Sequence, residues 1–136
     1  PFTRFLSAWS FARKGGGAVV KMSRRAQAEV LRFREPLDYA EHLAALPEKL
    51  RAKCDPVFRP QASYLCDPKG RIMVDKVFRV EDVAGMHFDF AGRRFSMRQK
   101  INAGEGEKRP SVASPDALRK VLRTLYAQDY AMFDYA

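Results

Sequence analysis

Apolar residues recur at helical spacing in the first twelve positions. Large apolar side chains stand at i, i+3, i+4 and i+7, namely Phe2, Phe5, Leu6 and Trp9. This spacing forms one face of an α-helix, and Pro1 is tolerated in the first turn because no hydrogen bond is lost there. The pattern predicts a helix over residues 1–12. Three consecutive glycines disfavour helix, so a basic, mobile loop is predicted over residues 13–17.

Helical spacing returns further along the chain. Apolar residues predict helices over 23–34 and 37–46, with Pro36 and Pro47 as helix starts or breaks. A terminal helix is predicted after Ser114, where an N-cap residue, a first-turn proline and an acidic residue follow one another. The stretch 102–114 is rich in glycine, proline and charge, which is typical of an irregular exposed loop.

Extended structure is predicted around the turn at 67–70. Residues 62–66 and 71–79 flank this Asp-Pro-Lys-Gly sequence and predict a β-hairpin or two neighbouring strands. The stretch from Glu81 is ambiguous, because Val83, Met86 and Phe90 suit a helix whereas residues 87–90 alternate as in a strand. We favour the helix there.

The overall composition indicates one domain over residues 1–136 with an anionic partner. The chain carries 25 Lys and Arg against 16 Asp and Glu, a formal charge of +9. No uncharged apolar stretch approaches the roughly 20 residues of a membrane-spanning helix. Cys54 and Cys66 have no neighbouring histidine to complete a metal-ligand pattern, so two reduced structural cysteines and no metal are predicted.

Residues 1–9 read PFTRFLSAW. This segment resembles the 3′-phosphate-binding segment of sulfotransferases that use 3′-phosphoadenosine 5′-phosphosulfate (PAPS), which reads Arg-x-Pro-x-x-Arg-x-x-Ser. In that family the first Arg and the Ser hold the 3′-phosphate. The first Arg would precede Pro1, so Ser7 alone carries over, with Arg4 as the neighbouring cation. A hydroxyl with a cation beside it can bind phosphate through charge-assisted hydrogen bonds.

Three later segments carry the same resemblance. Residues 55–61, DPVFRPQ, resemble the Asp-Pro-His-x-x-Pro-Gln segment of carbohydrate sulfotransferases, with Val57 in place of His. Residues 77–83, VFRVEDV, look like the family's strand ending in Arg-aromatic-Glu-x-Leu, and Val80 stands at the position close to adenine. Residues 122–135 are similar to the family ending, Tyr-x-x-Asp-aromatic and then Phe-Gly-Tyr, with Asp134 in place of Gly.

The resemblance implies an α/β, P-loop-NTPase-like sulfotransferase fold, of which this chain would be the mostly helical C-terminal part with a short β-hairpin or two strands. It implies transfer of a sulfuryl group from PAPS, without a metal, to a hydroxyl of a carbohydrate or similar acceptor. The expected cofactor-binding residues are Ser7, Arg4, Val80, Lys100, Lys108 and Arg109. The expected substrate-side residues are Arg13, Lys14, Arg59 and Gln61.

Parts of a complete sulfotransferase are missing from this sequence. The family's Gly- and Lys-containing phosphosulfate loop lies upstream of the Ser7 motif and does not occur here. We therefore expect the chain to be incomplete and inactive alone. The expected location is the cytoplasm. Neither His42, expected at the surface, nor His87 lies in a motif that would make it the catalytic base.

Two alternatives stay open. The charge, and aromatic residues interleaved with Arg and Lys, would also suit a basic nucleic-acid-binding module, although no recognition motif is present and no nucleic acid is expected. The second alternative is an inactive sulfotransferase-like protein. Arg13, Lys14, Arg24 and Arg25 would attract a sulfated or acidic sugar, but solvated surface charge explains them equally well.

Overall fold

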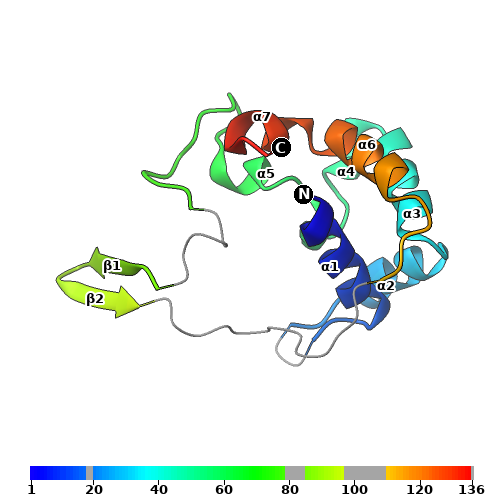
Figure 1. Cartoon of the computed structure of the whole chain (residues 1–136), viewed down its shortest axis with the longest axis horizontal. Helices are drawn as coiled ribbons and strands as arrows, with labels where there is room; N and C mark the ends of the chain where they lie inside the picture. The colour runs from blue at the N-terminus through cyan, green and yellow to red at the C-terminus, as the bar shows by residue number, and fades with distance from the viewer. Residues whose placement is uncertain (18–19, 79–84, 97–109, 136) are drawn as a thin grey trace.

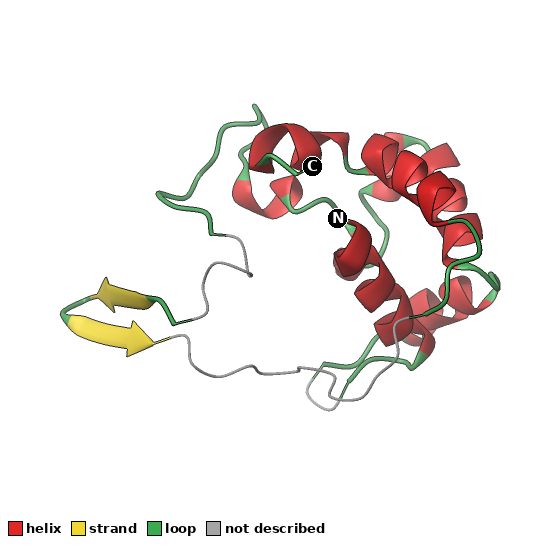
Figure 2. Ribbon diagram, in the orientation of Figure 1, coloured by secondary structure: helices red, strands yellow, loops and turns green. Residues whose placement is uncertain are grey.

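A computed structural model describes residues 1–17, 20–78, 85–96 and 110–135. Most of the described chain is a helical body, and a small antiparallel hairpin lies at one side of it (Figures 1 and 2). The elements are α1 (Phe2–Arg13), α2 (Arg24–Leu31), α3 (Pro36–Ala45), α4 (Glu48–Arg51), the 3-10 turn η1 (Pro56–Phe58), α5 (Ala62–Leu65), β1 (His87–Phe90), β2 (Arg93–Ser96), α6 (Pro115–Leu125) and α7 (Ala127–Phe133).

The helices predicted from apolar spacing are confirmed. The predicted helix over 1–12 is α1, and the predictions over 23–34 and 37–46 contain α2 and α3. The terminal helix begins at Pro115 as predicted, but the Ser114 side chain makes no capping hydrogen bond. The Asp116 carboxylate, which suits a helix N-terminus, accepts a hydrogen bond from Arg119 at 2.8 Å instead.

An aromatic core joins these helices. Phe5 on α1 lies with its ring centroid 5.7 Å from that of Phe58 and 6.5 Å from that of Tyr126. Tyr39 on α3 lies 5.0 Å from Phe58 and 5.6 Å from Trp9, distances typical of favourable aromatic pairs. Helix α3 packs along α6, and α1 contacts α2, α6 and η1. The core therefore brings the two ends of the chain against the segment around Phe58.

The predicted hairpin over 62–66 and 71–79 is wrong. Residues 62–65 form a helical turn, α5. Over the described residues 62–78, the one extended pairing is a bridge between Cys66 and Ile72. The turn is helical because a carboxylate from α7 accepts the amide hydrogens of Gln61 and Ala62. Such capping satisfies amides that have no partner within the helix.

The hairpin in this structure is β1–β2, which lies in the stretch for which the sequence favours a helix. His87 pairs with Ser96, and Phe90 pairs with Arg93. The two connecting residues have positive φ, 51° at Ala91 and 72° at Gly92, as in the two-residue turns that match strand twist. Alternation therefore prevails over helical spacing at 87–90. The earlier part of that predicted helix, residues 81–84, lies outside the described residues.

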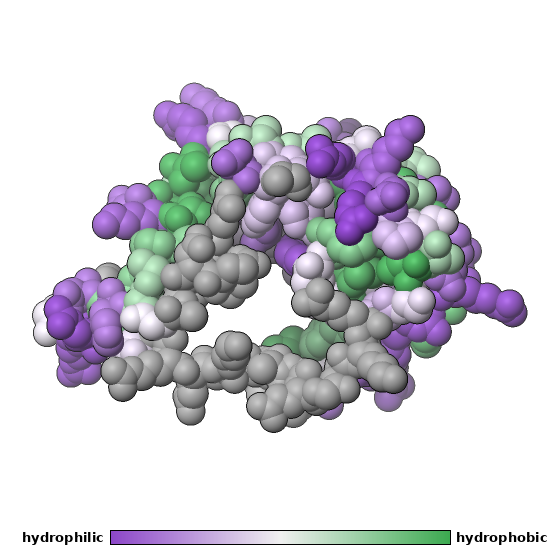
Figure 3. Space-filling view, viewed as in Figure 1, coloured by the Kyte–Doolittle hydropathy of each residue, from purple (hydrophilic) through white to green (hydrophobic). Residues whose placement is uncertain are grey.

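The described chain is thus a mixed structure of helices and one two-stranded antiparallel sheet. Of the predicted loop, residues 110–114 are irregular as expected, and 102–109 lie outside the described ranges. In the part of the chain that the structure describes, no helix has the length and apolarity needed to span a membrane. Exposed apolar side chains follow α5 toward the hairpin (Figure 3): Ile72, Met73, Val74, Val77 and Phe78.

Candidate functional site

The segment 55–61 is held in place by α1 and by Tyr126, the residue between α6 and α7. One Nη of Arg4 donates to the carbonyl oxygens of Val57 and Arg59. The Tyr126 hydroxyl donates to the Phe58 carbonyl at 2.9 Å and is buried there. The Arg4 guanidinium also lies 5.6 Å from the centroid of the Tyr126 ring. Arg4 therefore joins three segments of the fold, a packing role that the sequence did not suggest.

A buried carboxylate fixes the other end of the same segment. Asp129 is fully buried, and its two oxygens accept the amide hydrogens of Gln61 at 2.9 Å and Ala62 at 2.8 Å. The Tyr135 hydroxyl contacts the Gln61 side-chain oxygen at 3.0 Å. Segments 1–9, 55–61 and 122–135, far apart in the sequence, thus share one hydrogen-bond network. Asp129 was not predicted as a site residue, although an acid within an aromatic run is a signal of a paired buried charge.

Ser7 lies on the exposed side of α1. Thr3, Ser7, Ser10 and Lys14 recur at i, i+4, i+7 and i+11 and so form one polar stripe along this helix. Among the described residues, none forms a hydrogen bond with the Ser7 hydroxyl. The hydroxyl is thus available to a ligand from solvent.

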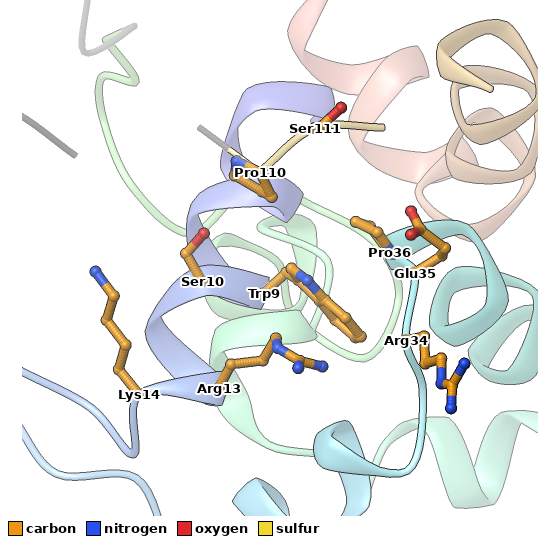
Figure 4. A pocket seen from close by; sticks show the side chains of 9 residues that line it. All are labelled: Trp9, Ser10, Arg13, Lys14, Arg34, Glu35, Pro36, Pro110 and Ser111. Carbon is orange, nitrogen blue, oxygen red and sulfur yellow. The ribbon is translucent and has the colours of Figure 1, made fainter. Parts of the chain in front are cut away.

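A cleft of about 420 Å³ lies at the C-terminal end of α1. Its lining comes from α1, from the turn into α3 and from the chain leading to α6 (Figure 4): Trp9, Ser10, Arg13, Lys14, Arg34, Glu35, Pro36, Pro110 and Ser111. The predicted substrate residues Arg13 and Lys14 both line it. Ser7 does not line it; the cleft meets this part of the chain at Trp9, Ser10, Arg13 and Lys14.

Cations dominate the cleft. Arg13 donates to the Phe33 carbonyl at 2.8 Å, and its guanidinium lies 5.3 Å from the centroid of the Trp9 ring. These contacts hold one positive charge in a fixed position. Arg13, Lys14 and Arg34 together supply three positive charges, against one negative charge from Glu35.

The other predicted residues lie elsewhere. Arg59 donates from Nε to the Cys54 carbonyl at 3.0 Å, and Gln61 is bound by Tyr135, so both belong to the hydrogen-bond network and neither lines the cleft. Four predicted cofactor residues lie outside the described residues: Val80, Lys100, Lys108 and Arg109.

The histidines and cysteines are now placed. His42 is partly buried, with Nε2 3.8 Å from a Glu29 oxygen, whereas His87 is exposed on β1. Both cysteines are free thiols, as predicted. Burial raises the pKa of the Cys54 thiol, which keeps it protonated and poorly nucleophilic.

Among the described residues, no group of three or more His, Cys, Asp or Glu side chains could hold a metal ion. Comparisons with protein-family models, with curated proteins and with solved structures find no match to this chain.

Proposed function

We propose that this chain is part of a PAPS-dependent sulfotransferase and supplies part of the 3′-phosphate site and of the acceptor site. The observation that carries the proposal is the Ser7 hydroxyl, which is exposed on α1 and has no partner among the described residues. In the motif that residues 1–9 resemble, this serine contacts the 3′-phosphate. The exposed hydroxyl fits that group, because an O–H donor binds a phosphate oxygen through a charge-assisted hydrogen bond.

The contacts between the resembled segments support the same proposal. Segments 1–9, 55–61 and 122–135 each resemble a part of the same family, and they meet in one network through Arg4, Tyr126 and Asp129. A scaffold of this kind fixes the position of α1 and therefore of Ser7. The proposal includes the P-loop-like fold for the complete enzyme, with this chain as its mostly helical C-terminal part.

In the complete enzyme, the acceptor hydroxyl would attack sulfur in line with the departing phosphate. A base would remove the hydroxyl proton, and cations would stabilise the charge that develops on the phosphate. The base is unassigned on this chain. What these residues would do is bind and orient the 3′-phosphate, an effect of position rather than of bond making.

Calorimetric titration with adenosine 3′,5′-bisphosphate and with AMP tests the proposal. The two nucleotides differ by the 3′-phosphate, so we expect the bisphosphate to bind at least tenfold more tightly. A hydrogen bond to a charged group contributes about 1.5–3 kcal/mol, so Ser7→Ala should weaken bisphosphate binding by roughly ten- to a hundredfold. Thr124→Ala, which removes an exposed hydroxyl on α6, is the matched control and should bind as the wild type does.

Equal affinity for the two nucleotides, or no change on Ser7→Ala, would contradict the proposal. Titration with single-stranded DNA at two salt concentrations covers the main alternative. A basic nucleic-acid-binding module would bind DNA in preference to the bisphosphate, with an affinity that falls steeply as salt rises.

A further inference from the structure

An apolar patch lies outside the hydrophobic core, on residues 72–78 and on the β1–β2 hairpin. The rings of Phe78 and Phe88 meet edge to face with their centroids 5.2 Å apart, so the two segments form one surface. The large apolar side chains of this patch that are at least 41% exposed are Ile72, Met73, Val74, Val77, Phe78 and Phe95. A contiguous exposed patch of this kind marks a binding site for a protein or a membrane.

The hairpin has one apolar face and one polar face. Residues that stand opposite each other in an antiparallel pair share a face, and neighbours along a strand lie on opposite faces. Phe88 and Phe95 therefore share one face. Asp89 and Arg94 share the other, where the Arg94 Nε lies 3.2 Å from an Asp89 carboxylate oxygen. A two-stranded hairpin alone is marginally stable in water, so a partner that covers the phenylalanine face would stabilise it.

The charges around the patch favour an anionic partner. Asp67 is paired with Arg71, as Asp89 is with Arg94. The other charged side chains on this part of the described chain have no described partner, and they are three cations and one acid: Lys69, Lys76, Arg93 and Asp75. Since the formal charge of the whole chain is +9, a second copy would bring like charge against the patch. An anionic surface complements it.

The patch suits a lipid surface better than a folded partner. A specific protein interface has about 20–30 residues on each side, and the patch draws on residues 72–78 and 87–96, which are fewer than that. Figure 1 shows the hairpin at the edge of the molecule, apart from the helices. Lipid requires no matching shape, because apolar side chains enter the acyl boundary while the charged ends of Lys and Arg stay among the headgroups.

We propose that this patch docks on the surface of an anionic lipid bilayer. The exposed apolar side chains of residues 72–78 and of Phe95 enter the boundary between headgroups and acyl chains. Lys69, Lys76 and Arg93 contact the charged headgroups. This lipid contact goes beyond the proposed nucleotide and acceptor sites and does not depend on them.

Flotation of the full chain with lipid vesicles tests the proposal. The probes are vesicles of phosphatidylcholine alone and vesicles of equal parts phosphatidylcholine and phosphatidylserine. Each Lys or Arg near an anionic surface strengthens binding by about fivefold. Binding to the phosphatidylserine vesicles should therefore be at least about tenfold tighter, and it should weaken as salt rises. Equal binding to both kinds of vesicle, or no binding to those with phosphatidylserine, would overturn the proposal.

Phe95→Ser and Leu50→Ser form a matched pair, because both side chains are 50% exposed and only Phe95 belongs to the patch. Phe95→Ser should weaken vesicle binding by about tenfold or more, whereas Leu50→Ser should change it less than about twofold. Met73→Ser, outside the hairpin, should weaken binding as well, so the test does not depend on the hairpin of one variant. None of these residues belongs to the buried core, so urea unfolding followed by Trp9 fluorescence should stay unchanged. Wild-type binding by both patch variants would contradict the proposal.

Lys76→Glu and Lys53→Glu separate the patch from the overall charge, since both residues are exposed and each change alters the net charge equally. Lys76→Glu should weaken binding at least about tenfold, and Lys53→Glu should weaken it less than about threefold. Equal loss in the two variants would overturn the proposal. So would a dimer in sedimentation equilibrium without vesicles that Phe95→Ser dissociates, because a second copy would then cover the patch. The proposed function fails separately: Ser7→Ala should bind vesicles as the wild type does, and Phe95→Ser should keep the preference for bisphosphate over AMP.

Discussion

Replacing Asp129 should destabilise the chain more than any surface substitution. Its carboxylate is fully buried and accepts two backbone amide hydrogens, from Gln61 and Ala62, at 2.9 and 2.8 Å. Asp129→Ala would leave both amides without a partner, and each unsatisfied buried donor costs about 1–3 kcal/mol. We therefore expect the free energy of unfolding to fall by about 3–5 kcal/mol.

Asp129→Asn tests the same contact at equal volume. The asparagine oxygen can accept one amide hydrogen, but its NH₂ group would face the other amide as a second donor. The expected loss is about 2–3 kcal/mol. Asp116→Asn is the control, because the Asp116 side chain is 98% exposed, and its ion pair should contribute less than about 1 kcal/mol.

Urea denaturation followed by Trp9 fluorescence measures these losses, since Trp9 is the only tryptophan and is packed in the core. If Asp129→Ala unfolds at the same urea concentration as Asp116→Asn, the buried carboxylate does not hold segment 55–61. The reasoning that links α7 to this segment would then be refuted.

Two further changes test the fold. Gly16 has φ of +108°, and a Cβ there would lie 2.5 Å from the Val20 carbonyl oxygen. Gly16→Ala should therefore lower the free energy of unfolding, measured by thermal unfolding, by about 2–3 kcal/mol. The control Gly70→Ala should lower it less, because Gly70 has φ of +79° but open space around it. Burial raises the pKa values of Tyr39 and Tyr126 above 10.0, so their contribution to stability is complete below pH 10 and is lost as pH rises beyond it. In urea titrations above pH 10, Tyr126→Phe should lose stability less steeply than the wild type by up to about 1.4 kcal/mol per pH unit, and an equal slope would contradict this.

The sequence predicted those elements whose signals are local. Helices α1 and α6 have apolar residues at every position that faces the core, and prolines mark the starts of α3 and α6. Arg13 and Lys14, at the C-terminal end of the first of these helices, line the cleft.

Long-range contacts decided what the sequence could not show. Residues 62–65 are helical because Asp129, 67 residues away from Ala62, accepts their first free amides. Arg34, Glu35 and Ser111 reach the cleft only through the packing of α3 and α6 beside α1. No spacing rule in the sequence connects these positions, because the contact depends on how separate helices pack.

Amide chemical-shift mapping with adenosine 3′,5′-bisphosphate tests the central claim most directly. In ¹H–¹⁵N correlation spectra, saturating bisphosphate should shift the amide signals of α1 around Ser7, and AMP at the same concentration should leave them nearly unchanged. Shifts that instead spread over the basic residues of α2 and the β1–β2 hairpin, or that are identical for both nucleotides, would contradict a 3′-phosphate site on this helix.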